Sequence, residues 1–116
     1  MLLSERRSKV MYEVQWTTPA REDLLSIVEY ISRMLKAPTA AENLLDQLEM
    51  ETVILEENPS IFPVSQDEYI AKLGIRHMLV KNYFLFYTID EEARTVSIIR
   101  MMYARRDWIH LLDGSS

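Results

Sequence analysis

Residues 75–108 read IRHMLVKNYFLFYTIDEEARTVSIIRMMYARRDW, and this stretch decides the fold of the chain. Three runs rich in β-branched and aromatic residues, at 75–80, 83–89 and 95–103, are separated by short polar turns. Such runs predict strands, and connections this short allow only antiparallel pairing between neighbours. The middle run is apolar on both faces, so we expect it to lie inside a sheet with each face covered.

The residues before this stretch predict one further strand and two helices. Residues 11–16 alternate between polar and apolar, which is typical of a half-buried strand that joins the same sheet. A hydroxyl cap at Thr17 or Thr18 followed by Pro19 predicts the start of the first helix. Thr39 and Glu42 have the spacing of a capping box for the second helix, which Asn58 and Pro59 end.

These elements predict one α+β domain with the order β-α-α-β-β-β. About three residues join the helices, so we expect an antiparallel helical hairpin that packs on an antiparallel sheet of about four strands. Residues 60–74 read as an irregular loop. We expect residues 1–10 to be a disordered extension, residues 11–112 to form the domain, and residues 113–116 to be a tail.

Composition narrows the functional classes. The chain has 116 residues, 48% of them hydrophobic and 27% charged, as in one ordinary globular domain. It has no cysteine and two histidines, so we expect no disulfide, no metal site and no cofactor. No apolar run approaches the roughly 20 residues that cross a bilayer, and the first residues do not resemble a signal peptide. We therefore expect a cytoplasmic protein.

The net charge of −5 is unevenly distributed. The predicted helices, between residues 18 and 58, are rich in carboxylates, whereas residues 72–107 have more Lys and Arg than Asp and Glu. An acidic half and a basic half are compatible with a site for a polyanion on the basic face. The other interpretation of the acidic half is a solvated helical surface.

Several motifs, taken in this order, resemble the RelE/ParE toxin superfamily of bacterial type II toxin–antitoxin modules, including the plasmid-stabilisation type. The resemblance covers residues 12–112. It rests on the helix openings at 18–24 and 40–44, the Asn58-Pro59 stop, the hairpin at 75–87, and the last strand and corner at 98–108.

This resemblance implies a toxin that a cognate antitoxin holds inactive. Members of the superfamily either cut mRNA on the ribosome or poison DNA gyrase, and the sequence leaves the target open. It also leaves open whether the chain forms a homodimer. A non-toxic protein-binding module of the same fold is the alternative from a different functional class.

If the chain is a ribosome-dependent mRNA endonuclease, four residues are the candidates for catalysis. Cleavage by attack of a 2′-hydroxyl needs cations on the phosphate and an acid for the leaving oxygen. Arginine suits the phosphate because its planar fork binds two oxygens at once. We therefore expect Arg76, Arg100 and Arg106 on the phosphate, and Tyr103 as the acid or as a stacking group.

Other features oppose a nuclease. Phe84 stands where members that cut mRNA usually carry an arginine, so the phosphate clamp looks incomplete. Arg106 is followed by Asp107 and could instead close the corner through an ion pair. His77 alternates with Arg76 along the predicted strand. We therefore interpret His77 as a partly buried residue of the sheet rather than as a catalytic acid.

Overall fold

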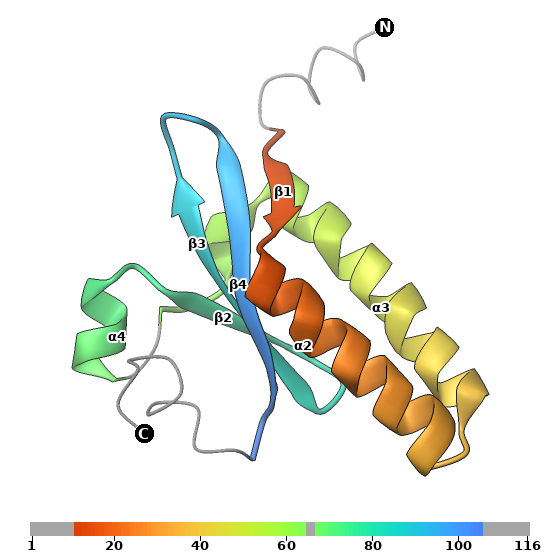
Figure 1. Ribbon diagram of the computed structural model, residues 1–116. Coiled ribbons are helices and arrows are strands. Elements are labelled where there is room, and N and C mark those ends of the chain that lie inside the picture. Colours follow the sequence, from red (N-terminus) through yellow and green to blue (C-terminus); the bar gives the residue numbers. More distant parts are fainter. Residues whose placement is uncertain (1–10, 65–66, 106–116) are drawn as a thin grey trace, which may run out of the picture.

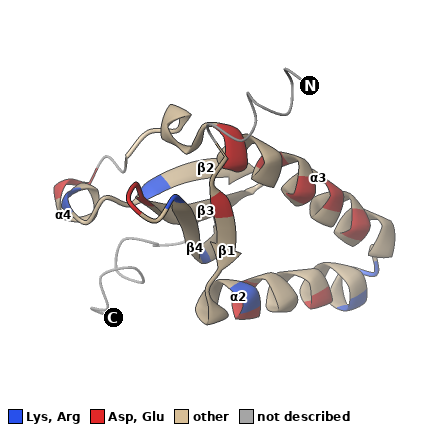
Figure 2. Cartoon of the chain, turned by 90° about the horizontal axis from the view of Figure 1, so that it is seen from above, with Lys and Arg blue, Asp and Glu red and all other residues tan. Residues whose placement is uncertain are grey.

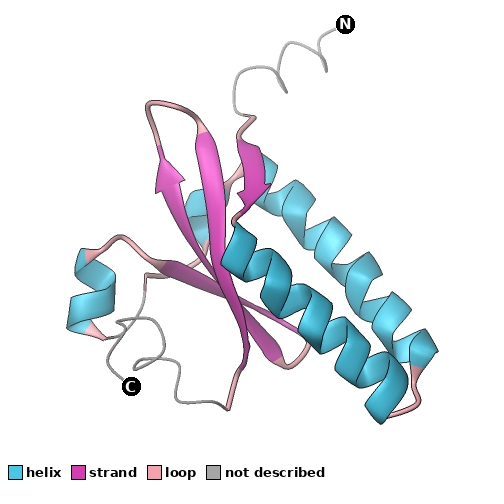
Figure 3. Cartoon of the chain, viewed as in Figure 1, coloured by secondary structure: helices cyan, strands magenta, loops and turns pink. Residues whose placement is uncertain are grey.

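The computed structural model describes residues 11–64 and 67–105, which form a four-stranded sheet with two long helices on one face (Figures 1 and 3). The strands are β1 (Glu13–Trp16), β2 (Arg76–Val80), β3 (Tyr83–Asp90) and β4 (Thr95–Tyr103), in the spatial order β1-β4-β3-β2. The predicted α+β class and element order are confirmed.

The direction of β1 differs from the prediction. β2–β3 and β3–β4 are antiparallel, but β1 pairs with β4 in parallel, with Glu13 opposite Thr95 and Trp16 opposite Ile98. The short turns fix the direction of the last three strands only. Both helices and two strands lie between β1 and β4 in the chain, so the sequence does not constrain how these two strands run.

The helical hairpin consists of α2 (Thr18–Glu29), a π-helical turn η1 (Tyr30–Met34) and α3 (Pro38–Glu57). A threonine hydroxyl caps α2 as predicted, since that of Thr17 accepts the amide of Ala20, but the helix begins at Thr18, one residue before the predicted first position at Pro19. The predicted capping box of α3 is wrong. The helix already begins at Pro38 with Ala37 as its cap residue, because proline is well suited to a first helical turn.

The main core lies between the hairpin and the sheet. Tyr87 on β3 is its largest fully buried side chain, and its hydroxyl donates to the carbonyl of Pro59 over 2.6 Å. Burial raises the pKa of Tyr87 to about 12, partly opposed by the positive charge of Arg76. The other buried members of this core include Leu44, Leu48, Leu55, Met78, Leu85 and Ile98.

The other face of the sheet carries a second, smaller cluster of buried side chains. It contains Phe86 and Met102 from the sheet, together with Ile75 and Ile70. Ile70 comes from a short helix, α4 (Glu68–Lys72), which the sequence did not predict. Asp67 caps this helix by accepting the amide of Ile70, and five residues are too few for a periodic pattern to be visible.

The predicted extension at residues 1–10 and the predicted tail at 113–116 lie outside the described residues. Across residues 11–64 and 67–105, the helices are too short or too polar to span a bilayer.

Replacing Tyr87 with Phe tests how far the core depends on the contact with Pro59. The substitution keeps the ring but leaves a buried carbonyl without its donor, so we expect the free energy of unfolding to fall by about 1–2 kcal/mol. Urea denaturation measures this. Tyr69→Phe is the control, because Tyr69 on α4 is 55% exposed. Equal stability of Tyr87→Phe and wild type would contradict the assignment.

Candidate functional site

Three hydrogen bonds to one carboxylate join α2 to β4. β1 pairs with β4 only as far as Ile98, so the edge of β4 beyond that residue has no neighbouring strand within residues 11–64 and 67–105. Asp23 on α2 supplies the missing acceptor. Its carboxylate accepts the amide of Met101 over 3.0 Å and binds the Arg100 guanidinium through two hydrogen bonds, Nε–Oδ2 at 2.7 Å and Nη2–Oδ1 at 3.0 Å.

This bidentate contact stabilises the charged form of Arg100. The hydrogen bonds that Arg100 donates to Asp23 raise the pKa of Arg100, against the opposing effect of burial, and the charges of Asp23 and Glu22 add to the rise. The side chains of Arg100 and Asp23 are 33% and 18% exposed, so water screens the pair only in part. Arg100 is therefore a permanent cation whose charge is neutralised within the fold.

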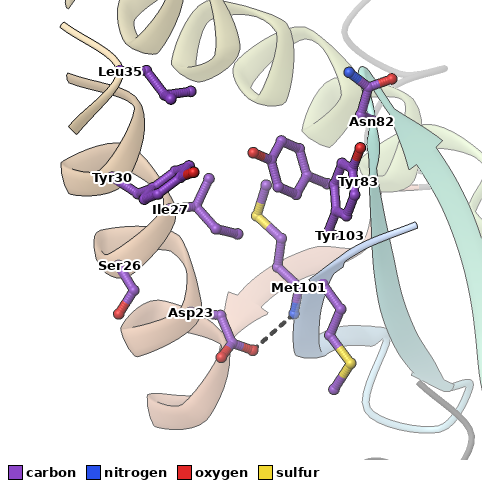
Figure 4. A pocket seen from close by; sticks show the side chains of 10 residues that line it. Asp23, Ser26, Ile27, Tyr30, Leu35, Asn82, Tyr83, Met101 and Tyr103 are labelled. Carbon is purple, nitrogen blue, oxygen red and sulfur yellow. Dashed lines mark hydrogen bonds between the residues drawn. The ribbon is translucent and has the colours of Figure 1, made fainter. Parts of the chain in front are cut away.

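A groove of about 810 Å³ opens beside this contact, between α2 and the far end of the β3–β4 hairpin (Figure 4). We call it the tyrosine groove. The helical wall consists of Asp23, Ser26, Ile27, Tyr30 and Leu35. The wall on the sheet side consists of Asn82, Tyr83, Met101, Met102 and Tyr103.

Tyr83 and Tyr103 are cross-strand partners, and their rings meet edge to face with centroids 5.8 Å apart. Tyr30 lies across the groove from them (Figure 4). Burial raises the pKa of Tyr83, and the nearby phenols of Tyr103 and Tyr30 raise it further. All three tyrosines thus place a phenol group and an aromatic ring at the groove.

Tyr30, which lines the groove, is also the first residue of a π-helical turn. At the end of α2 the amide of Leu35 donates to the carbonyl of Tyr30, five residues earlier, over 3.0 Å. This π-helical turn shifts the residues that follow around the helix relative to a regular α-helix. Such turns are rare and are frequent at functional sites.

The predicted catalytic arginines do not converge within the described chain. Arg76 on β2 is opposite Tyr87, and Arg100 on β4 is opposite Phe86. Consecutive residues of β3 point to opposite faces of the sheet. Nη1 of Arg76 donates to the carbonyls of Phe62 and Ser60, over 2.6 Å and 3.4 Å. Both guanidinium groups therefore have internal partners, on different sides of β3.

Of the other two candidates, Tyr103 lies in the tyrosine groove and is 41% exposed, whereas Arg106 lies outside the described residues. A role in catalysis for these four residues stays a prediction. Sequence reasoning missed Tyr30 and Tyr83 as site residues. Tyr83 directly follows the Lys81-Asn82 turn, which the sequence located, so its position at the end of a strand was predictable. Tyr30 has no such marker and reads as one more residue of an amphipathic helix.

His77 and Phe84 lie on the opposite face from the helices. Their rings meet edge to face at 5.2 Å, and Phe86 lies next to both. Nδ1 of His77 is buried and has no hydrogen-bond partner among the described residues, and burial lowers the pKa of His77. Within residues 11–64 and 67–105, no cluster of His, Cys, Asp and Glu side chains could hold a metal ion.

Comparison with known proteins defines the family. The model of the family described as "ParE toxin of type II toxin-antitoxin system, parDE" matches residues 14–108, and the chain belongs to this family. The predicted membership of the RelE/ParE superfamily is thereby confirmed.

Solved structures agree on the fold. The chromosomal ParDE TA system from P. aeruginosa includes a chain that is 17% identical with a TM-score of 0.65, over 82% of this chain and 98% of that one. The RelBE2 toxin-antitoxin complex from Mycobacterium tuberculosis gives 26% identity and a TM-score of 0.58, over 81% and 99%. The intact E. coli RelBE complex gives 17% and 0.51, over 82% and 99%.

A curated human relative is described as "Putative serine/threonine-protein phosphatase 4 regulatory subunit 1-like". It is 26% identical over 86 residues, which is 72% of this chain. The chain spans about a fifth, 21%, of the length of that relative.

The contact between Asp23 and Arg100 predicts an unequal effect of two carboxylate substitutions on α2. Asp23→Asn keeps the shape of the side chain but loses its charge, so we expect a loss of about 1–2 kcal/mol in the free energy of unfolding after allowing for screening. The matched control is Glu29→Gln, which breaks an exposed pair with Arg33 and should cost about 0.5 kcal/mol or less. Chemical denaturation with equal losses for both variants would contradict this ranking.

His77 predicts a pH dependence of stability. Its pKa is lower in the folded protein than the ordinary 6.5, so below that pH the unfolded chain binds more protons than the folded chain. Stability is then lost as the pH falls from about 6.5 through the folded pKa. We expect His77→Gln to reduce the drop in urea midpoint between about pH 7.5 and about pH 5. Identical drops in variant and wild type would argue against this.

Proposed function

We propose that this chain is the toxin of a type II toxin–antitoxin pair, neutralised by a cognate antitoxin, and that it inhibits growth without cutting RNA. DNA gyrase is the target that this proposal implies, since the superfamily resemblance offers gyrase or ribosome-bound mRNA. Membership of the ParE toxin family supports the toxin assignment.

One observation supports the choice between the two targets. The guanidinium of Arg100 is held by Asp23, and that of Arg76 by two backbone carbonyls, so neither is available for a phosphate without breaking an internal contact. Phe84 also stands where the resemblance leads us to expect a cation. An RNA-cleaving site needs cations gathered at one phosphate, and the described sheet does not gather them.

The solved relatives support a protein partner. Several are toxin–antitoxin complexes, among them the RelBE2 complex of M. tuberculosis at 26% identity. Exposed apolar side chains on the helical hairpin also fit a protein that is covered by a partner; they include Leu25, Met34, Leu35, Met50 and Val53.

Induction in growing cells tests the proposal. We expect growth arrest with induced DNA damage, inhibition of gyrase supercoiling by the purified chain, and rescue by co-expression of the neighbouring reading frame. Tyr103→Phe keeps the ring but removes the only proton that Tyr103 could give a leaving oxygen. Under the proposal this variant stays fully toxic, because no acid catalysis is involved.

Two results would contradict the proposal in different ways. Primer extension that shows cleavage at ribosome-bound codons, lost in Tyr103→Phe and in Arg106→Ala, would establish the nuclease instead. Harmless overexpression, with no antitoxin encoded beside the gene, would favour the non-toxic binding module.

A further inference from the structure

A second groove lies between α2 and α3, next to the end of β1. We call it the hairpin groove. Its volume is about 360 Å³, and Trp16, Leu24 and Leu48 supply apolar surface within it. Leu45 on α3 also lines the groove and is 42% exposed. The hairpin groove therefore presents apolar side chains that a segment of another protein could cover.

The α3 wall of this groove is acidic. Asp46 and Glu49 line it, and Glu42 lies one turn before Asp46 on the same helix. Residues three and four apart on a helix are neighbours on one face, so these three carboxylates form an acidic stripe. All three residues are exposed, and within residues 11–64 and 67–105 none of them forms an ion pair.

The acidic stripe is not balanced by cations on its own helix. The 20 residues of α3 include no Lys or Arg, whereas α2 carries charges of both signs (Figure 2). Like charges at this spacing destabilise a helix, so the stripe opposes the stability of α3 instead of supporting it.

The other charges around the groove do not change its sign. Arg21 on α2 is the one cation within four positions of a lining residue in the sequence, and it is exposed. Asp23 is bound by Arg100, and Glu51 accepts a hydrogen bond from the side chain of Gln47. The charged residues within the same four positions that neither line the groove nor are cations are all carboxylates: Glu13, Glu22, Asp23, Glu42, Glu51 and Glu56.

A basic protein segment fits this combination of apolar surface and free carboxylates. Lys and Arg side chains have apolar stems that can pack against Leu45 and Trp16 while their charged heads reach Asp46 and Glu49. Opposite charges across an interface steer association and fix its register. The same carboxylates repel phosphate groups, so this face of the chain is unsuited to bind nucleic acid directly.

The target named under the proposed function carries basic surface. DNA gyrase acts on duplex DNA, and proteins that bind DNA neutralise its phosphates with Lys and Arg. We infer that the hairpin groove binds a basic segment of gyrase, with Lys or Arg side chains on Asp46 and Glu49 and an apolar contact on Leu45. This inference rests on the proposed function, because that function supplies the target.

Inhibition of gyrase supercoiling by the purified full-length chain tests the inference. The double variant Asp46→Lys, Glu49→Lys opposes a basic segment with two cations, so the half-inhibitory concentration should rise about tenfold or more. The matched control is the double variant Glu68→Lys, Glu92→Lys, which makes the same change in net charge. Both of its positions are exposed and neither lines the groove, so it should stay within about twofold of wild type.

The apolar contact gives a second, independent arm. Leu45→Ala removes apolar surface from the groove and should raise the half-inhibitory concentration about fivefold or more. Leu73→Ala is the control, because Leu73 follows α4, is 52% exposed and does not line the groove. Urea denaturation of each variant shows that the fold is kept.

The dependence of binding on salt gives a third readout. The affinity of the wild-type chain for gyrase should fall as salt is added, whereas the remaining affinity of the Asp46→Lys, Glu49→Lys variant should not, since the attraction that salt screens has been removed.

The outcomes separate this inference from the proposed function. If the wild-type chain inhibits gyrase and the Asp46→Lys, Glu49→Lys variant inhibits it equally, the groove assignment is overturned and the proposed function stands. A wild-type chain that arrests growth without inhibiting gyrase would overturn both the proposed target and the groove assignment. If the double variant inhibits gyrase like wild type but loses affinity for the antitoxin encoded beside the gene, the groove holds the antitoxin and the inference is overturned.

Discussion

The unpaired edge of β4 is the constraint on which the rest of the structure depends. A strand that extends beyond its neighbour exposes backbone amides that need acceptors. Here one carboxylate satisfies both the amide of Met101 and the neighbouring Arg100, and it comes from the second turn of α2. The contact fixes α2 against the sheet, and α2 in turn positions the π-helical turn that carries Tyr30.

The same contact limits the ability of Arg100 to bind an external phosphate. Arg100 holds Asp23 through hydrogen bonds of 2.7 Å and 3.0 Å. Moving Arg100 to an external phosphate would cost free energy, because the Asp23 carboxylate would be left partly buried and unpaired. The tyrosine groove next to it has no such cost. Its lining combines three tyrosines with the buried side chains of Met101 and Met102, and aromatic residues beside apolar surface are common where proteins bind one another.

Features set by local sequence were predictable. The strands at 75–103, their turns and the cap of α2 each depend on residues close together in the chain, so their patterns are visible. Positive φ angles at Lys81 and Arg94 occur in the two turns that the sequence located. The start of α3 was misjudged by two residues, because the predicted cap was Thr39 whereas Ala37 is the cap and Pro38 takes the first helical position.

Features set by distant residues could not be predicted. Asp23 reads in the sequence as an ordinary acidic residue near a helix N-terminus, and nothing local links it to Arg100, 77 residues later. The parallel direction of β1 and the internal contacts of Arg76 depend equally on the assembled fold. The four candidate catalytic residues were chosen by residue type. The sequence does not reveal that Arg76 and Arg100 make tertiary contacts with Phe62 and Asp23.

The most direct test is the nuclear magnetic resonance signal of the Arg100 guanidinium. Our account predicts a resolved Nε–H resonance that exchanges slowly with water, disappears in Asp23→Asn, and does not shift when a single-stranded RNA oligonucleotide is added. A rapidly exchanging resonance that moves on addition of the RNA would contradict it, because Arg100 would then be free to bind phosphate.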